Sequence, residues 1–84
     1  MITAQVSIYP LRQEVIGPAI REAVRGLGRH EVKVRMGGMS TLVWGEEQAI
    51  FDALQDVFRR AAERGDVVMN VTFSNACPEP AGAE

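Results

Sequence analysis

The sequence has almost no cysteine, since Cys77 is the only one among 84 residues. A single thiol cannot form a disulfide within the chain, which excludes the small secreted folds that disulfides hold together. A bridge to a second chain stays open. The fold must therefore rest on an apolar core, and 46% hydrophobic residues suffice for one compact domain.

Long apolar runs and a strong charge of one sign are also missing. No stretch approaches the roughly 20 apolar residues that span a bilayer, and the first residues, MITAQV, contain no basic leader. Nine basic and eleven acidic residues give a net charge of -2, which argues against a broad surface for nucleic acid or anionic lipid. We expect a soluble, cytoplasmic protein with no nucleic-acid partner and no membrane insertion.

The apolar residues follow two different periods along the chain. Alternation predicts strands over residues 2–9, 32–36, 39–45 and 67–74. A spacing of three and four predicts amphipathic helices over residues 14–27 and 46–65. The Gly37-Gly38 pair predicts the turn of a hairpin between the second and third strands.

The order βαββαβ predicts the α+β ferredoxin-like fold, a four-stranded antiparallel sheet with both helices on one face. In this fold the first strand is central, between the third and the fourth, and the second strand lies at an edge. We expect one such domain over residues 1–76. Residues 77–84 contain too little apolar surface to order themselves, so we expect a flexible tail there.

The sheet face that the helices leave open is predicted to carry polar side chains without charge. By alternation it receives Gln5, Ser7 and Tyr9 from the first strand and Val68, Asn70, Thr72 and Ser74 from the last. A face meant only for water usually carries Lys, Glu or Arg, so this composition favours cover by a ligand, another chain or both. The β-propensity of threonine explains Thr72 without a function, whereas Asn70 offers groups that need specific partners.

The hairpin adds three further candidates. Ser40 and Thr41 point to opposite faces, so only one of them can join Ser7 and Asn70. Trp44 shares the side of Ser40, but the competing apolar residues of the hairpin leave open which side is buried. A stacking platform is one interpretation of Trp44, and a place in the core or in an interface is favoured over it.

The sequence predicts no catalytic site and no metal site. His30 has no patterned cysteine or carboxylate partner and is expected to be a solvated loop residue. Cys77 lacks a second cysteine at redox spacing, and Gly37-Gly38 does not extend to a phosphate-binding glycine motif. The acidic residues between positions 46 and 56 fit a solvated helix face better than an acid–base pair. We therefore expect no reaction and no cofactor.

Four segments together resemble the YkoF family of thiamin- and hydroxymethylpyrimidine-binding proteins. They are residues 6–11 (VSIYPL), 40–45 (STLVWG), 68–74 (VMNVTFS) and the terminal Cys77-Pro78. The resemblance, which covers residues 4–78, implies a non-enzymatic binding protein in thiamin uptake or salvage, with thiamin as ligand and a link to a transporter. The family includes chains with two such domains, so this single domain is expected to form a homodimer or homotetramer.

The chemistry of that ligand indicates which residues would contact it. Its pyrimidine presents an exocyclic amine beside ring-nitrogen acceptors, which Ser7, Thr41 and Asn70 can match without net charge. Its thiazolium cation can lie against an aromatic ring. The full set of ligand-binding candidates is Ser7, Tyr9, Ser40, Thr41, Trp44, Asn70 and Thr72.

Two features qualify the ligand that the resemblance implies. No phosphate-binding cluster occurs, so the unphosphorylated ligand is expected to bind better than the diphosphate. Gly37-Gly38 stands where the family can have polar residues, which removes contacts to thiamin, and Glu79 follows Cys-Pro where a glycine is common.

Two other classes of function stay open. An ACT-like domain for ligand sensing or oligomeric interaction would explain the open sheet face without thiamin. A small ferredoxin-like enzyme of the isomerase or monooxygenase type would need His30 or Tyr9 in a pocket.

Overall fold

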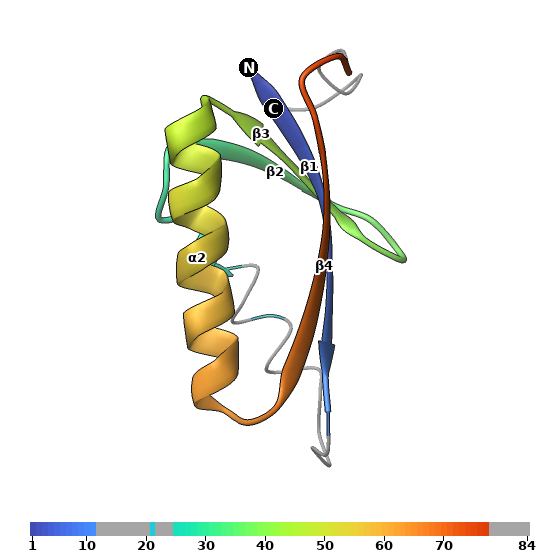
Figure 1. Ribbon diagram of the computed structural model, residues 1–84, viewed down its shortest axis with the longest axis vertical. Helices are drawn as coiled ribbons and strands as arrows, with labels where there is room; N and C mark the ends of the chain where they lie inside the picture. Colours follow the sequence, from blue (N-terminus) through green and yellow to red (C-terminus); the bar gives the residue numbers. More distant parts are fainter. Residues whose placement is uncertain (12–20, 22–24, 78–84) are drawn as a thin grey trace.

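The structure is a computed structural model that describes residues 1–11, 21 and 25–77. The described elements are β1 (Ile2–Pro10), β2 (Val32–Met36), β3 (Thr41–Gly45), α2 (Glu47–Glu63) and β4 (Val67–Ser74). They form one antiparallel sheet in the order β2-β3-β1-β4, with α2 against one face (Figure 1). The predicted ferredoxin-like βαββαβ fold is confirmed. Most of the predicted first helix, residues 14–27, lies outside the described residues. Its described positions, 21 and 25–27, are helical.

The register of β1 fixes which side chains face α2. Ala4 lies between Val43 of β3 and Phe73 of β4, and Val6 lies between Thr41 and Val71. Ala4 and Val6 are buried, while Gln5, next to both, is exposed. Successive side chains of a strand point to opposite faces, so the predicted division of β1 into a helix-facing and an open set is confirmed.

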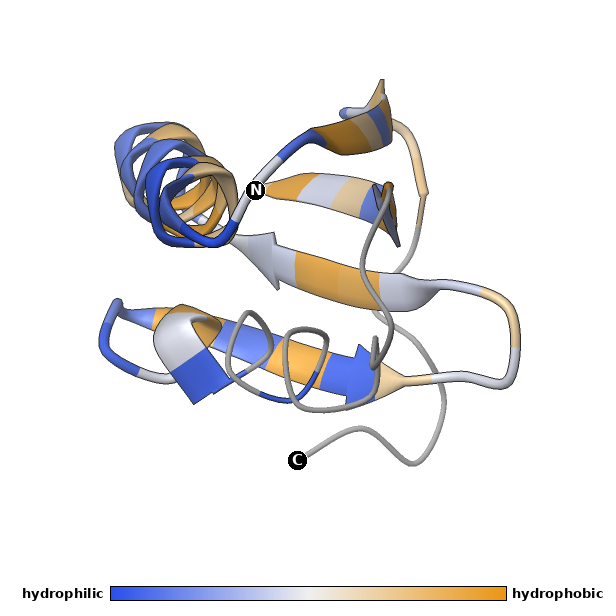
Figure 2. Cartoon of the chain, turned by 90° about the horizontal axis from the view of Figure 1, so that it is seen from below, coloured by the Kyte–Doolittle hydropathy of each residue, from blue (hydrophilic) through white to orange (hydrophobic). Residues whose placement is uncertain are grey.

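The core lies between the sheet and the apolar side of α2. Figure 2 shows the hydrophobic side of α2 turned toward the strands and its hydrophilic side turned away. The central residues of the core are fully or almost fully buried, namely Ala4, Val6, Leu27, Val43, Ile50, Ala53, Leu54 and Val57. Burial of one large aliphatic side chain contributes about 1.5–3 kcal/mol, so this contact holds the two layers together.

Both ends of α2 follow the signals in the sequence. The acidic Glu47 lies in the first turn and the basic Arg60 in the last. Each charge is therefore opposite in sign to the end of the helix dipole beside it, which stabilises the helix. Arg64 caps the C-terminus, and Gly65 follows with a φ of 142°. That φ is one that L side chains rarely adopt, which explains the glycine where the chain turns toward β4.

The apolar stripe of α2 is wider than the surface that the sheet covers. The sequence predicts Phe51 and Phe58 to lie on the stripe with the buried residues, but they are 48% and 43% exposed. Phe51 stacks on Phe73 of β4, the last strand at that edge of the sheet, and Phe58 lies two helical turns further along the same side of α2. The sheet ends there, so their outer surfaces remain uncovered.

The β2–β3 hairpin has a longer turn than predicted. Met36 pairs with Thr41, and the turn comprises residues 37–40. The expectation that the third strand begins at Met39 is wrong, because the N–H of Gly37 donates to the carbonyl of Ser40 over 2.8 Å and closes the turn.

Replacing Gly37 by alanine should destabilise the fold. A Cβ at this position would lie 2.8 Å from the carbonyl oxygen of Ser40, a contact that backbone movement must relieve. We expect Gly37→Ala to lower the free energy of unfolding by about 1–3 kcal/mol, measured by urea denaturation. Gly38→Ala is the matched control, since a Cβ there meets nothing within 4 Å; equal stability of the two variants would contradict this account.

Candidate functional site

Two strands bring most of the predicted site residues together on the open face. Ser7 lies directly opposite Asn70, and Tyr9 lies opposite Val68. Thr72 lies opposite Gln5. Opposite residues of an antiparallel pair have their Cβ atoms about 4.5–5.5 Å apart, so these uncharged groups form one continuous patch.

The structure separates Ser40 from Thr41. The Ser40 hydroxyl accepts a hydrogen bond of 3.0 Å from the side-chain amide of Gln5, which places Ser40 on the open face. Thr41 pairs with Val6 and Met36 and shares their face, toward the helices. Thr41 therefore lies on the opposite side of the sheet from Asn70.

Trp44 is fully buried although it does not belong to the helix-facing core. It is 0% exposed, yet it pairs with Thr3 on one side and Lys33 on the other. Both alternate with helix-facing residues, so Trp44 belongs to the open face. Its side chain is therefore closed to solvent, in contrast to Tyr9, which is 49% exposed, although Trp44 borders a depression of about 320 Å³ together with Met1, Glu31, Val32, Lys33, Gly45 and Glu46.

A cavity of about 300 Å³ opens at the end of the sheet where the hairpin turn meets β1. Its described lining consists of Val6, Ser7, Ile8, Leu27, Met36, Gly37, Gly38, Met39, Ser40 and Thr41. None of these residues is charged. The cavity thus combines apolar walls with a few hydroxyl and backbone groups, which is typical of sites for small organic molecules.

The residues that line this cavity come from segments far apart in the sequence, so no local sequence pattern predicts it. Leu27 lies at the end of the helical residues 25–27 and Val6 on the central strand, and the hairpin turn reaches both only in the folded chain. Of the predicted ligand-binding residues, Ser7, Ser40 and Thr41 line the cavity. Tyr9, Trp44, Asn70 and Thr72 are not among its described lining residues.

A shallower depression on the open face has a different chemistry. It has a volume of about 380 Å³ and is lined by Gln5, Arg35, Gly37, Ser40 and Leu42. The guanidinium of Arg35 makes it less suited than the first cavity to a cationic ligand.

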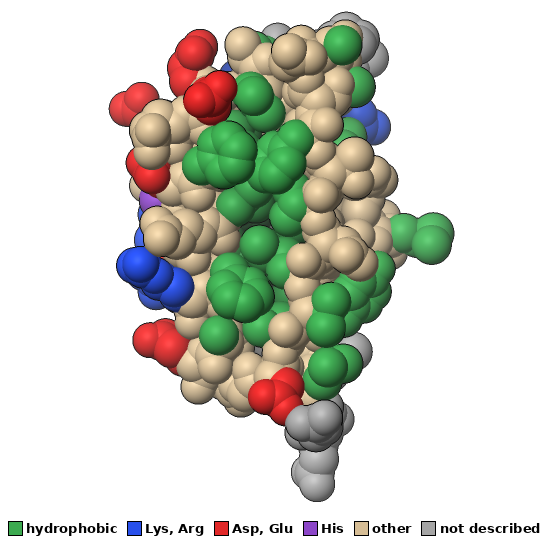
Figure 3. All heavy atoms as spheres, viewed as in Figure 1, with side chains coloured by type: hydrophobic (Ala, Val, Ile, Leu, Met, Phe, Trp, Pro, Cys, Tyr) green, Lys and Arg blue, Asp and Glu red, His purple; other side chains and the backbone are tan. Residues whose placement is uncertain are grey.

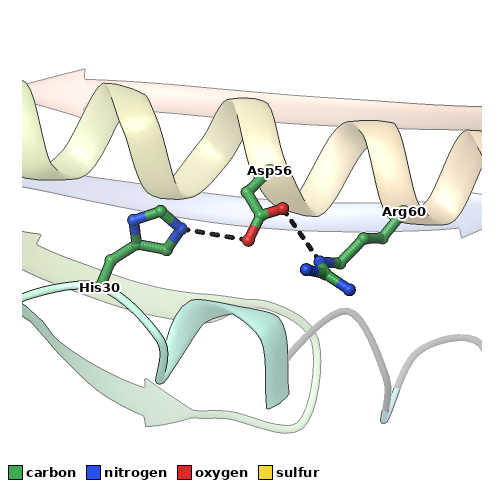
Figure 4. A network of polar contacts seen from close by, with 3 residues as sticks. All are labelled: His30, Asp56 and Arg60. Atoms are coloured by element: carbon green, nitrogen blue, oxygen red, sulfur yellow. Dashed lines mark hydrogen bonds and ion pairs between the residues drawn. The ribbon is translucent and has the colours of Figure 1, made fainter.

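His30 is held in a polar network between the first helical segment and α2 (Figure 4). Its Nε2 lies 3.1 Å from Oδ2 of Asp56, and Nε of Arg60 donates to Oδ1 of the same carboxylate over 2.9 Å. The His30 side chain is 23% exposed. His30 lies in the loop before β2, as expected, but the expectation of a solvated side chain is wrong, because α2 brings a carboxylate against the ring.

The network lowers the pKa of Asp56 from its ordinary value of 3.8. The hydrogen bond from His30 is the largest cause of the lowered pKa. Burial, the next largest effect, raises the pKa, and the hydrogen bond and charge of Arg60 act with His30 to lower it. Asp56 is thus a structural carboxylate that ties the junction before β2 to α2. Arg60 on its other oxygen makes the pair a fixed contact rather than an exposed acid–base site.

Other chemistry is not assembled in the parts of the chain that the structure describes. In residues 1–11, 21 and 25–77, no three His, Cys, Asp or Glu side chains lie close enough to hold a metal ion. The described helices include none that is both long and apolar enough to cross a membrane. Cys77 is an exposed free thiol, and the rest of the predicted tail, residues 78–84, lies outside the described residues.

A family model described as "YKOF-related Family" matches residues 1–80. The chain belongs to this family. The resemblance drawn from the sequence segments is thereby confirmed, and three of these segments overlap β1, β3 and β4 of the sheet described above.

The chain is also similar to an individual protein that is named for binding a ligand. The Bacillus subtilis (strain 168) protein named "Putative HMP/thiamine-binding protein YkoF" is 32% identical over 73 residues. The match covers 86% of this chain and 36% of the relative. The chain therefore spans only about a third of the length of this relative.

Solved structures share the fold at low sequence identity. A hypothetical protein from Methanocaldococcus jannascii superposes with a TM-score of 0.82 at 21% identity, covering 94% of this chain and 84% of the other. A protein from Thermotoga maritima, described as a "putative thiamine biosynthesis/salvage protein", gives a TM-score of 0.77 at 19% identity over 99% and 87% of the two chains. At such identities these likenesses show the fold alone.

The Asp56 network predicts a pH-dependent contribution to stability. A carboxyl group whose pKa is lower in the folded state stabilises the fold above its unfolded pKa, and this contribution disappears as the pH falls through the folded value. We therefore expect Asp56→Asn to be less stable than the wild type near pH 7, with the difference shrinking below about pH 4.

Urea denaturation of both proteins between pH 3 and pH 7 measures this difference. Glu63→Gln is the control, because Glu63 is an exposed carboxylate on the same helix. A stability difference for Asp56→Asn that stays constant across this pH range would contradict the assignment.

Proposed function

We propose that this protein binds thiamin or its hydroxymethylpyrimidine moiety, without chemical change, in the cavity between the hairpin turn and β1. The observation that carries this proposal is the lining of the cavity, in which no described residue is charged and hydroxyl groups lie beside apolar walls. Such a site favours a small, largely apolar heterocycle with a few hydrogen-bonding groups.

The pyrimidine ring matches the two kinds of lining. Val6, Ile8 and Leu27 offer apolar surface to the faces and the methyl group of the ring. The Thr41 hydroxyl can accept from the exocyclic amine or donate to a ring nitrogen, since a hydroxyl has one donor and two acceptor sites. The turn at residues 37–40 adds backbone groups, and its glycines let a ligand approach the main chain closely.

The proposal departs from the sequence-based set in one respect. Thr41 becomes the main polar contact, and Ser40 and Ser7 also line the cavity. Asn70, Thr72 and Tyr9 are then left to the open face, where they need another explanation. A ligand on that face, with Asn70 as its anchor, is the competing hypothesis.

The family and its named relatives support the class of ligand. The Bacillus subtilis relative is named for binding HMP and thiamine, and the Thermotoga maritima protein is described by thiamine biosynthesis or salvage. A role in thiamin uptake or salvage, delivery to a transporter and a cytoplasmic location are part of the same proposal. The name of the relative is that of a binding protein, which supports a function without catalysis.

Removal of one hydroxyl tests the location of the ligand. Thr41→Val keeps the shape of the side chain and removes its hydrogen-bonding group, so we expect it to weaken hydroxymethylpyrimidine binding by about 3–10-fold. Isothermal titration calorimetry measures the change. Asn70→Ala is the matched control on the other face and should leave the affinity within about twofold; the reverse pattern would assign the ligand to the open face.

The choice of ligand can be tested in the same titration. The cavity lining contains no described cationic side chain to bind phosphate, so thiamin should bind more tightly than thiamin diphosphate. Equal or tighter binding of the diphosphate would contradict the proposed site. If none of the three ligands binds up to millimolar concentration, the thiamin function itself is wrong, and the ACT-like alternative takes its place.

A further inference from the structure

Two of the four methionines lie where the hairpin turn borders the cavity. Met36 is the last residue of β2 and Met39 lies in the turn at residues 37–40, and both line the cavity. Met36 is 56% exposed and Met39 is 94% exposed. Figure 3, drawn in the view of Figure 1, shows hydrophobic side-chain atoms standing clear of the surface at the place of this turn. The opening of the cavity is therefore bordered by thioether groups that solvent reaches.

The strand register places one of these thioethers beside the hydroxyl group of the proposed site. Met36 lies opposite Thr41, and Thr41 lies opposite Val6. Opposite residues of an antiparallel pair have Cβ atoms about 4.5–5.5 Å apart, so the side chain of Met36 can reach that of Thr41. A thioether is apolar, flexible and polarizable, and it packs well against an aromatic ring. In its reduced form Met36 thus extends the apolar wall and offers the Thr41 hydroxyl only a weak acceptor.

Oxidation changes both of these properties. When hydrogen peroxide reacts with a thioether, a lone pair of the sulfur forms the new S–O bond, the O–O bond breaks and water leaves. The product, methionine sulfoxide, is polar, and its oxygen accepts hydrogen bonds. At Met36 this oxygen can take the hydrogen bond of the Thr41 hydroxyl that the ligand needs. At Met39 it puts a polar group at the opening of a cavity with apolar walls.

The other two methionines allow a comparison within the same chain. Met1 is 65% exposed, but it borders the separate depression that contains Gly45 and Glu46 and is not among the described lining residues of the cavity. Met69 is partly buried and packs against the core. Because an oxidant must reach the sulfur, peroxide should oxidise Met1, Met36 and Met39 before Met69. Of these three, only Met36 and Met39 border the cavity.

We propose that Met36 and Met39 form a reversible oxidation site that weakens ligand binding in the cavity. A hydroperoxide oxidises the two side chains. Methionine sulfoxide reductases reverse the change, with two thiols that become a disulfide while the oxygen leaves as water. The inference rests on the proposed function, because it assigns a regulatory step to the same cavity. The reduced protein holds the ligand, and the oxidised protein releases it.

Calorimetry before and after oxidation tests this site. All proteins carry Cys77→Ser, because Cys77 is an exposed thiol that peroxide also oxidises, and mass spectrometry of the digested protein identifies the oxidised methionines. The reduced protein should bind hydroxymethylpyrimidine. Hydrogen peroxide should oxidise Met36 and Met39 and raise the dissociation constant about fivefold or more. Treatment with reductases for both sulfoxide epimers should return the constant to within about twofold of its initial value.

Leucine variants separate this site from general oxidative damage. Met36→Leu/Met39→Leu keeps apolar side chains of similar volume, so it should bind the ligand within about threefold of the Cys77→Ser protein and should lose no affinity in peroxide. Met69→Leu is the matched control and should stay as sensitive to peroxide as the Cys77→Ser protein. Circular dichroism establishes that each oxidised protein is folded.

The two parts of the experiment distinguish the inference from the proposed function. A reduced protein that does not bind hydroxymethylpyrimidine would overturn the proposed function and the oxidation site together. Undiminished binding after oxidation of both Met36 and Met39 would overturn the oxidation site alone. So would a double leucine variant that loses affinity in peroxide as strongly as the Cys77→Ser protein, or a Met36 and Met39 that stay reduced while Met1 is oxidised.

Discussion

The position of β1 between β3 and β4 is the constraint on which the rest of the structure depends. Because β1 is paired on both sides, one register assigns every side chain of three strands to the helix side or to the open face. Ala4 and Val6 are small enough to let α2 pack closely above them. A shift of one residue would bury Gln5 and Ser7 under α2, which the apolar core would not tolerate.

The same register divides the molecule into surfaces of different chemistry. Thr41 is carried to the helix side with Val6, at a cavity whose described lining has no charge. Asn70 and Ser7 are carried to the open face as direct neighbours. The outer edge of β4 is a third surface, which is apolar and continues onto α2. The described lining of the cavity therefore shares no residue with β4.

Most of the fold could be predicted from the sequence, because its signals are local. The bounds of β4 and the alternation of β1 follow from period two, and Gly65 ends α2 as expected. How far the sheet extends beside α2 depends on the whole fold, not on the sequence of α2. The exposure of Phe58 was therefore not predictable from the spacing of apolar residues in the helix. The His30–Asp56 contact joins residues 26 apart in the chain, and only the packing of the first helical segment against α2 creates it.

The candidate site was predicted less completely, for a geometric reason. Alternation shows that Ser40 and Thr41 point to opposite faces but does not assign either one, and the pairing of Thr41 with Val6 makes that assignment. The apolar character of Trp44 favours burial, but its register puts it on the open face, outside the helix-facing core. A cavity formed by three separate segments has no signature in any one of them.

The central claim is that the ligand lies in the cavity at the hairpin turn. A titration of the ¹⁵N-labelled protein with hydroxymethylpyrimidine, followed by ¹H–¹⁵N correlation spectra, tests it most directly. The account predicts saturable shifts concentrated in the amides of Val6, Ile8 and residues 37–41. Shifts concentrated at Asn70 and Thr72, with the hairpin turn unchanged, would contradict it.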